Sequence, residues 1–87
     1  MVRNYVIDLR DLTSLNNFII EANQFTEDIN AIYGNHVVDA KSYIGLASIS
    51  MHPVKVEIIT NSQLITEKFY SICKPYLHKE RNEREEV

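Results

Sequence analysis

The chain has 87 residues, of which 45% are hydrophobic and 24% are charged, and its formal net charge is -3 at pH 7. A chain of this length has material for one hydrophobic core, so we expect a single domain that folds without a cofactor. The acidic balance argues against general binding to nucleic acid or to anionic membranes, because both need clustered Lys and Arg.

The N-terminal part of the chain predicts a strand and then a helix. Apolar side chains alternate within residues 2–9, which is typical of a strand with one buried face. These side chains are Tyr5, Ile7 and Leu9. From residue 12 the apolar spacing becomes helical, with Asp11 or Thr13 as the N-cap. The helical stripe consists of Leu15, Phe18, Ile19, Ala22 and Phe25.

The middle of the chain predicts a hairpin followed by a short helix. Residues 28–33 and 36–40 both alternate, and the pair Gly34-Asn35 between them tolerates positive φ, so we expect two antiparallel strands joined by a tight turn. Residues 41–49 predict a short helix with Ser42 as its N-cap. Its apolar face could be formed by three side chains, which are Tyr43, Ile44 and Ala47.

The C-terminal part predicts a strand, a last helix and a tail. Residues 54–58 alternate most clearly of all, and Asn61 or Ser62 can cap a helix that Pro75 should kink or end. The order β-α-β-β-α-β-α predicts an α+β fold, an open-faced β-sandwich in which a four-stranded antiparallel sheet carries three helices on one face. We assign residues 1–79 to the domain and residues 80–87 to a charged tail that is expected to fray.

Catalytic, metal and targeting signals are weak throughout. The single Cys73 has no partner for an internal disulfide, and the three histidines lack metal-ligand spacing, so we expect neither a metal nor another cofactor. No Ser/His/Asp set or phosphate-cradling Gly loop is present, so an enzyme is not expected. The N-terminus resembles no signal peptide and no apolar run could span a bilayer, which predicts a cytoplasmic protein without a membrane segment.

The stretch FTEDINAIYGNHVVDAKSYIGLASI, residues 25–49, combines several recognisable features. An aromatic and an acidic residue precede the hairpin, an Asn/Gly pair closes it, and a Lys-Ser-x-x-Gly helix start follows. The residues are Phe25, Asp28, Gly34-Asn35, Lys41-Ser42 and Gly45. Together with the element order, this pattern resembles the HPr phosphocarrier family of the bacterial sugar phosphotransferase system. The resemblance implies an HPr-like fold.

In that family a histidine in the motif G-[IL]-H-A-R-P-A, at the start of the first helix, accepts a phosphoryl group. Aligned without gaps, this chain has Asp11 at the histidine position, Thr13 at the arginine position and Ser14 at the proline position. The resemblance therefore implies an HPr-like protein without histidine phosphotransfer. Asp11 is interpreted mainly as an N-cap, with a phosphohistidine-like charge or an atypical phosphoryl acceptor as alternatives.

Two further correspondences concern regulation. Ser42 matches the serine that a dedicated kinase phosphorylates in Gram-positive members, which then recruit a transcriptional regulator. Tyr43, Ile44 and Ala47 match an apolar patch that contacts partner proteins. We therefore expect a monomeric regulatory module with protein partners such as a serine kinase or a transcriptional regulator. The alternatives are a scaffold unrelated to sugar transport and a ferredoxin-like RNA binder, which the acidity and the absence of an aromatic-basic strand motif disfavour.

Overall fold

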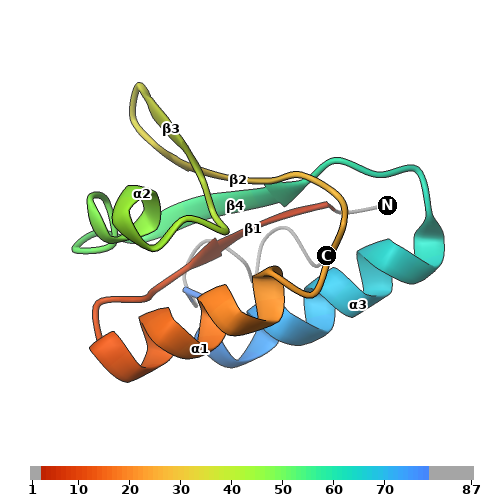
Figure 1. Ribbon diagram of the computed structural model, residues 1–87, viewed down its shortest axis with the longest axis horizontal. Helices are drawn as coiled ribbons and strands as arrows, with labels where there is room; N and C mark the ends of the chain where they lie inside the picture. Colours follow the sequence, from red (N-terminus) through yellow and green to blue (C-terminus); the bar gives the residue numbers. More distant parts are fainter. Residues whose placement is uncertain (1–2, 79–87) are drawn as a thin grey trace.

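The computed structural model describes residues 3–78 (Figure 1). The predicted tail 80–87 and the domain boundary at residue 79 therefore lie outside the described residues. In chain order the elements are β1 (Asn4–Ile7), α1 (Leu12–Ala22), β2 (Ile29–Tyr33), β3 (His36–Asp39), α2 (Tyr43–Ala47), β4 (Val54–Ile58), α3 (Gln63–Cys73) and the 3-10 helix η1 (Lys74–Tyr76). This confirms the predicted α+β order, with η1 added after the last helix.

The four strands form one antiparallel sheet in the order β1-β4-β2-β3. Val56 is paired with Tyr5 on one side and with Ala31 on the other, and all three side chains are buried on the same face. The neighbouring row lies on the opposite face and includes Lys55 and Ile32. Because side chains alternate across a strand, one face is apolar and needs a cover.

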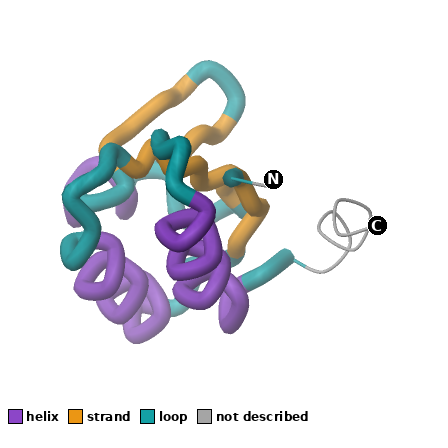
Figure 2. Tube along the Cα trace, turned by 90° about the vertical axis from the view of Figure 1, so that its right-hand side faces the viewer, coloured by secondary structure: helices purple, strands orange, loops and turns teal. Residues whose placement is uncertain are grey.

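The helices supply this cover from one side. Helices α1 and α3 lie next to each other under the apolar face (Figures 1 and 2). Helix α2 lies on the same side, because an added Cβ at Gly45 would be 3.4 Å from Val38 Cβ, and Val38 shares the covered face. The largest fully buried side chains are Phe18, Phe69, Ile7, Leu9, Leu15, Ile29, Leu46, Ile58, Val54, Val56 and Cys73. The predicted single core with three helices on one face is confirmed.

The segment after α3 covers one edge of the sheet. Helix α3 ends at Cys73, and Pro75 lies in the 3-10 turn, which agrees with the expectation that this proline ends the helix. The amide of Asp8 then donates to the carbonyl of Tyr76 (2.8 Å), the amide of His78 donates to the carbonyl of Val6 (2.8 Å), and Ile7 bridges to Leu77. The outer edge of β1 is therefore paired.

The hairpin turn uses a positive φ at its first residue only. Gly34 has φ +59°, while no other residue of the described part of the chain has a positive φ. A two-residue hairpin with this pattern matches a type II′ turn, for which Gly at the first central position is preferred.

Replacing Gly34 with alanine is therefore expected to lower the free energy of unfolding by about 1–2 kcal/mol, because a Cβ disfavours this region. No atom lies within 4 Å of the added Cβ, so the cost is conformational rather than steric. Urea denaturation measures it, with Asn35→Ala as the control, which should change stability by less than about 0.5 kcal/mol. Equal stability of both variants would contradict the assigned turn.

Candidate functional site

The start of α1 contains Asp11, which the resemblance places where the phosphoryl-accepting histidine of the family would stand. Asp11 precedes the helix with extended backbone angles, and its Oδ2 accepts hydrogen bonds from the Ser14 amide (3.0 Å) and the Ser14 hydroxyl (3.2 Å). The predicted N-cap is therefore confirmed at Asp11 rather than at Thr13, which lies exposed within the helix. The carboxylate itself occupies an amide that an anion would otherwise bind.

The arginine nearest to this helix start is engaged elsewhere. Arg10 Nη2 lies 2.6 Å from Asp8 Oδ2, and Arg10 Nε donates to Asp8 Oδ1 at 3.0 Å. The side-chain hydrogen bond from Arg10 lowers the pKa of the Asp8 carboxyl, against a smaller opposing effect of burial. Because this pair is mutually neutralised, it does not replace the phosphate-stabilising arginine that the family motif places at the position of Thr13.

The start of α2 is built around Ser42. Its Oγ accepts a hydrogen bond from the Gly45 amide at 3.2 Å, which confirms Ser42 as the predicted N-cap. Asp39 supports the same turn, since its backbone carbonyl accepts from the Ser42 amide (3.0 Å) and its Oδ1 accepts from the Lys41 amide (2.9 Å). The Lys41 ammonium points away from this turn and donates to the Phe25 carbonyl at 2.6 Å.

The orientation of α2 decides which of its apolar residues are available to a partner. Leu46 is fully buried and Ala47 is half-buried against the core, so these two residues anchor the helix. Tyr43 is exposed, and Ile44 has 83% of its surface exposed. Of the three residues predicted to form a partner surface, Tyr43 and Ile44 therefore face solvent. Ala47 instead packs against the core, next to the buried side chain of Leu46.

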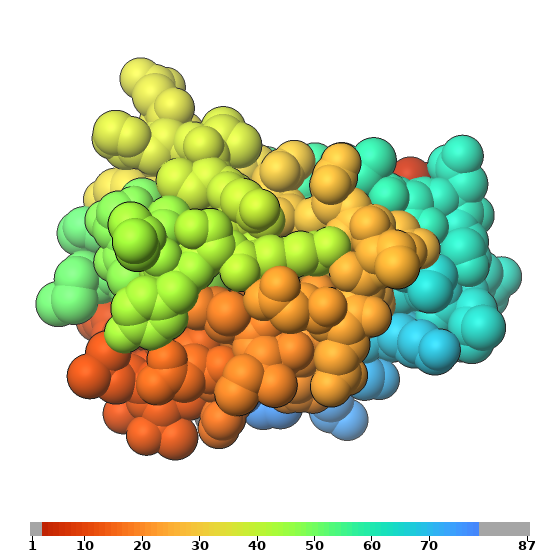
Figure 3. Space-filling view, viewed as in Figure 1, coloured from red at the N-terminus to blue at the C-terminus, as the bar shows by residue number. Residues whose placement is uncertain are grey.

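Helices α1 and α2 present a shared surface. The Asn23 side-chain amide donates both to the Ile19 carbonyl (2.9 Å) and to the Lys41 carbonyl (3.1 Å), which ties the end of α1 to the beginning of α2. The atoms of α2 lie directly against those of α1 on one face of the molecule (Figure 3). We define the α1–α2 surface by the large apolar residues that these helices and the following loop expose: Leu12, Ile20, Tyr43, Ile44 and Met51.

The sequence contains a signal for this surface that apolar periodicity does not reveal. Residues 12–20 and 42–54 contain no Asp, Glu, Lys or Arg, although 24% of the chain is charged. The two charge-free runs are separated by more than twenty residues in sequence, and the contact between α1 and α2 brings them together. Depletion of charge together with exposed Leu, Ile, Tyr and Met is the composition found at the centre of protein interfaces.

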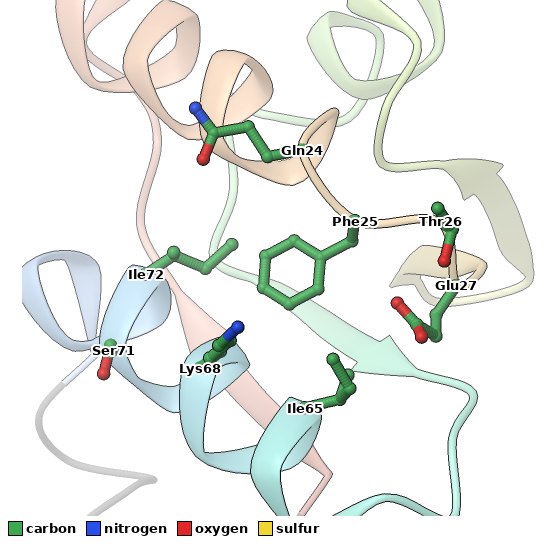
Figure 4. A pocket seen from close by; sticks show the side chains of 8 residues that line it. All are labelled: Gln24, Phe25, Thr26, Glu27, Ile65, Lys68, Ser71 and Ile72. Atoms are coloured by element: carbon green, nitrogen blue, oxygen red, sulfur yellow. The ribbon is translucent and has the colours of Figure 1, made fainter.

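An open hollow of about 470 Å³ lies between α3 and the loop that follows α1 (Figure 4). Phe25 points between Ile65 and Ile72 and forms its apolar floor, while Lys68 and Glu27 lie at the rim. The polar groups at the rim are solvent-accessible, and no buried side-chain polar atom within residues 3–78 lacks a hydrogen-bond partner. Among the described residues, no unpartnered buried side-chain polar atom therefore points into the hollow.

A second hollow of about 430 Å³ lies on the uncovered face of the sheet, next to the hairpin turn. Ile32, Lys55 and His78 line it. Nearby, the rings of Tyr33 and His52 are stacked with their centroids 4.3 Å apart and their planes 4° apart. Among the described residues no group of three His, Cys, Asp or Glu side chains could hold a metal ion.

No helix between residues 3 and 78 has the length and apolar character needed to span a membrane. When the chain is compared with protein-family models, with curated proteins and with solved structures, none of them matches it.

Proposed function

We propose that this chain is an HPr-like regulatory protein that acts by binding other proteins through the α1–α2 surface, without histidine phosphotransfer and without catalytic activity of its own. The observation that carries the proposal is the exposed, charge-free apolar surface beside the Ser42 cap. Ile44 at 83% exposed and Met51 at 67% exposed are large side chains for which solvent is a poor environment. Grouped apolar exposure of this kind is typical of interaction sites.

The start of α1 supports binding rather than phosphoryl transfer. No histidine lies in α1 or next to it in sequence, and Asp11 uses its carboxylate to cap Ser14. Arg10, which precedes Asp11 in sequence, is paired with Asp8. A phosphocarrier needs an acceptor and cationic or amide groups to stabilise the incoming phosphate, and here the cap and the ion pair already use these groups.

Ser42 is proposed as the switch. Its Oγ now accepts one hydrogen bond from the Gly45 amide, and a phosphoryl group on that oxygen would add about two negative charges at the first turn of α2. The added charge would lie next to Tyr43 and Ile44, in a surface that otherwise has no ionised side chain of its own. Phosphorylation would therefore change the partner preference of the α1–α2 surface without requiring the fold to change.

The proposal is tested by incubating the protein with ATP and an HPr-type serine kinase and measuring the intact mass. We expect a single phosphate group to be added, and we expect Ser42→Ala to abolish this addition. Ser48→Ala is the matched control, because Ser48 is the exposed cap at the other end of the same helix and its loss should leave phosphorylation intact. No incorporation into the wild-type protein would favour a scaffold that is unrelated to sugar transport.

The phosphocarrier alternative is tested separately at Asp11. We expect no phosphate to be transferred from phosphoenolpyruvate by the donor enzyme of the phosphotransferase system, because the Asp11 carboxylate is a capping group. The measurement is the intact mass after reaction, with and without hydroxylamine, which cleaves acyl phosphates. A hydroxylamine-sensitive phosphate that Asp11→Asn removes would contradict the proposal.

A further inference from the structure

We infer that the partner of the α1–α2 surface presents an apolar centre bordered by Lys or Arg side chains. The inference rests on the proposed function, since it names the partner of the same surface. It follows from the charged side chains that surround the two charge-free runs and from the direction in which each charged side chain points.

The border of the surface contains exposed or half-exposed carboxylates. Asp11 stands at the beginning of α1, next to Leu12, and it is exposed. Glu21 does not belong to this border, because it lies on the flank of α1 near Tyr76, whereas Asn23 on the opposite flank donates to Lys41 at the start of α2. Asp39 is held at the beginning of α2 by the amide of Lys41.

The cations close to these segments in sequence are directed elsewhere. The Lys41 ammonium donates to the Phe25 carbonyl at 2.6 Å and is partly buried there. Arg10 is bound to Asp8 through two of its nitrogens. Lys55 follows the second charge-free run but lies on the uncovered face of the sheet, in the same row as Ile32. The border therefore keeps its carboxylates exposed while its cations are compensated or turned away.

An interface over this surface would remove water from the border carboxylates. Desolvation of a carboxylate is unfavourable unless an opposite charge replaces the water, and complementary charge around an apolar centre also accelerates association. A partner with basic residues around an apolar centre satisfies both requirements. A partner with an acidic border would bring like charges together.

The test selects peptides from a random phage-displayed library on the wild-type protein and discards those that also bind a Leu12→Ser/Ile44→Ser variant. We expect the remaining peptides to combine apolar residues with a net positive charge. When the selected peptides are synthesised, Ile44→Ser should weaken their binding to the protein at least about tenfold. Added salt should weaken their binding to the wild-type protein as well.

The charge itself is tested with the double variant Asp11→Asn/Asp39→Asn. Asn keeps the acceptor oxygen that caps α1 and the one that supports the turn before α2, so the fold should be preserved, which an unchanged urea midpoint verifies. We expect this double variant to bind the basic peptides several-fold more weakly and with less dependence on salt. The control for net charge is Glu21→Gln/Glu67→Gln, which also removes two carboxylates, one near Tyr76 and one on α3, and should leave binding unchanged.

The outcomes separate the two proposals. If selected peptides lose binding in the Leu12→Ser/Ile44→Ser variant but are neutral or acidic, or if Asp11→Asn/Asp39→Asn binds them as tightly as wild type, the basic partner is excluded and the surface stands. If no peptide is sensitive to Leu12 and Ile44, the surface of the proposed function fails as well.

Discussion

Replacing Phe69 with alanine is expected to lower the free energy of unfolding by about 3–5 kcal/mol. The Phe69 side chain is fully buried on α3, where its ring centroid lies 6.0 Å from that of Tyr5 and 6.3 Å from that of Phe25. Its removal takes away contacts with β1 and with the loop after α1 at the same time, and a packed sheet can close such a cavity only in part. Urea denaturation measures the loss.

The control for this substitution is Leu64→Ala on the same helix. Leu64 is a large apolar residue with 61% of its surface exposed, so its truncation should change the free energy of unfolding by less than about 0.5 kcal/mol. If Phe69→Ala lowered the free energy of unfolding as little as Leu64→Ala, α3 would not pack on β1 and on the loop after α1 as described.

The sequence could predict the strands and the long helices because each repeats its period often enough to be recognised. In β4 the alternation runs through Val54, Val56 and Ile58, all of which are buried, and α1 keeps Leu15, Phe18 and Ala22 on one stripe. The N-cap Ser42 lies where side-chain chemistry predicts it, and Asp11 and Ser62 are each one of the two candidates that the sequence left open. Side-chain contacts between elements, such as that of Phe69 with Tyr5, could not be predicted, since they depend on how the elements pack.

The orientation of α2 could not be obtained from its sequence. The helix has five residues, fewer than two turns, so apolar periodicity does not define a face. Ile44 and Leu46 are similarly apolar, yet Leu46 is fully buried and Ile44 is almost fully exposed. The difference arises from the close approach of α2 to β3 at Gly45, which is a tertiary contact.

The candidate surface could be predicted only in part, because it too depends on a tertiary contact. The resemblance indicated Tyr43, Ile44 and Ala47, but Leu12, Ile20 and Met51 were not expected to join them. The charge-free runs 12–20 and 42–54 are visible in the sequence, although only the contact of α1 with α2 shows that they belong to one surface. The pairing of Leu77 with Ile7 was missed as well, because a single bridge has no alternation to detect.

The thiol of Cys73 is expected to react with a thiol reagent at least about 1,000-fold more slowly in the native protein than in urea. Cys73 is the last residue of α3, its side chain is fully buried, and burial raises the pKa of its thiol well above the usual range. The reactive thiolate can therefore form only after the protein opens. The measurement is the rate of reaction with Ellman's reagent at pH 8 in buffer and in urea.

The Phe69→Ala variant distinguishes whether Cys73 becomes exposed by global unfolding or by local opening of the end of α3 and η1. If Cys73 reacts only through global unfolding, a loss of about 3 kcal/mol should raise the native reaction rate by about 100-fold or more, since 1.4 kcal/mol corresponds to a factor of ten. If the end of α3 and η1 opened alone, the rate would respond weakly to Phe69, which lies one turn earlier in α3. We expect the first outcome, because Cys73 belongs to the same core cluster as Phe69 and Ile7. Native and urea rates of similar size would contradict the burial of the thiol itself.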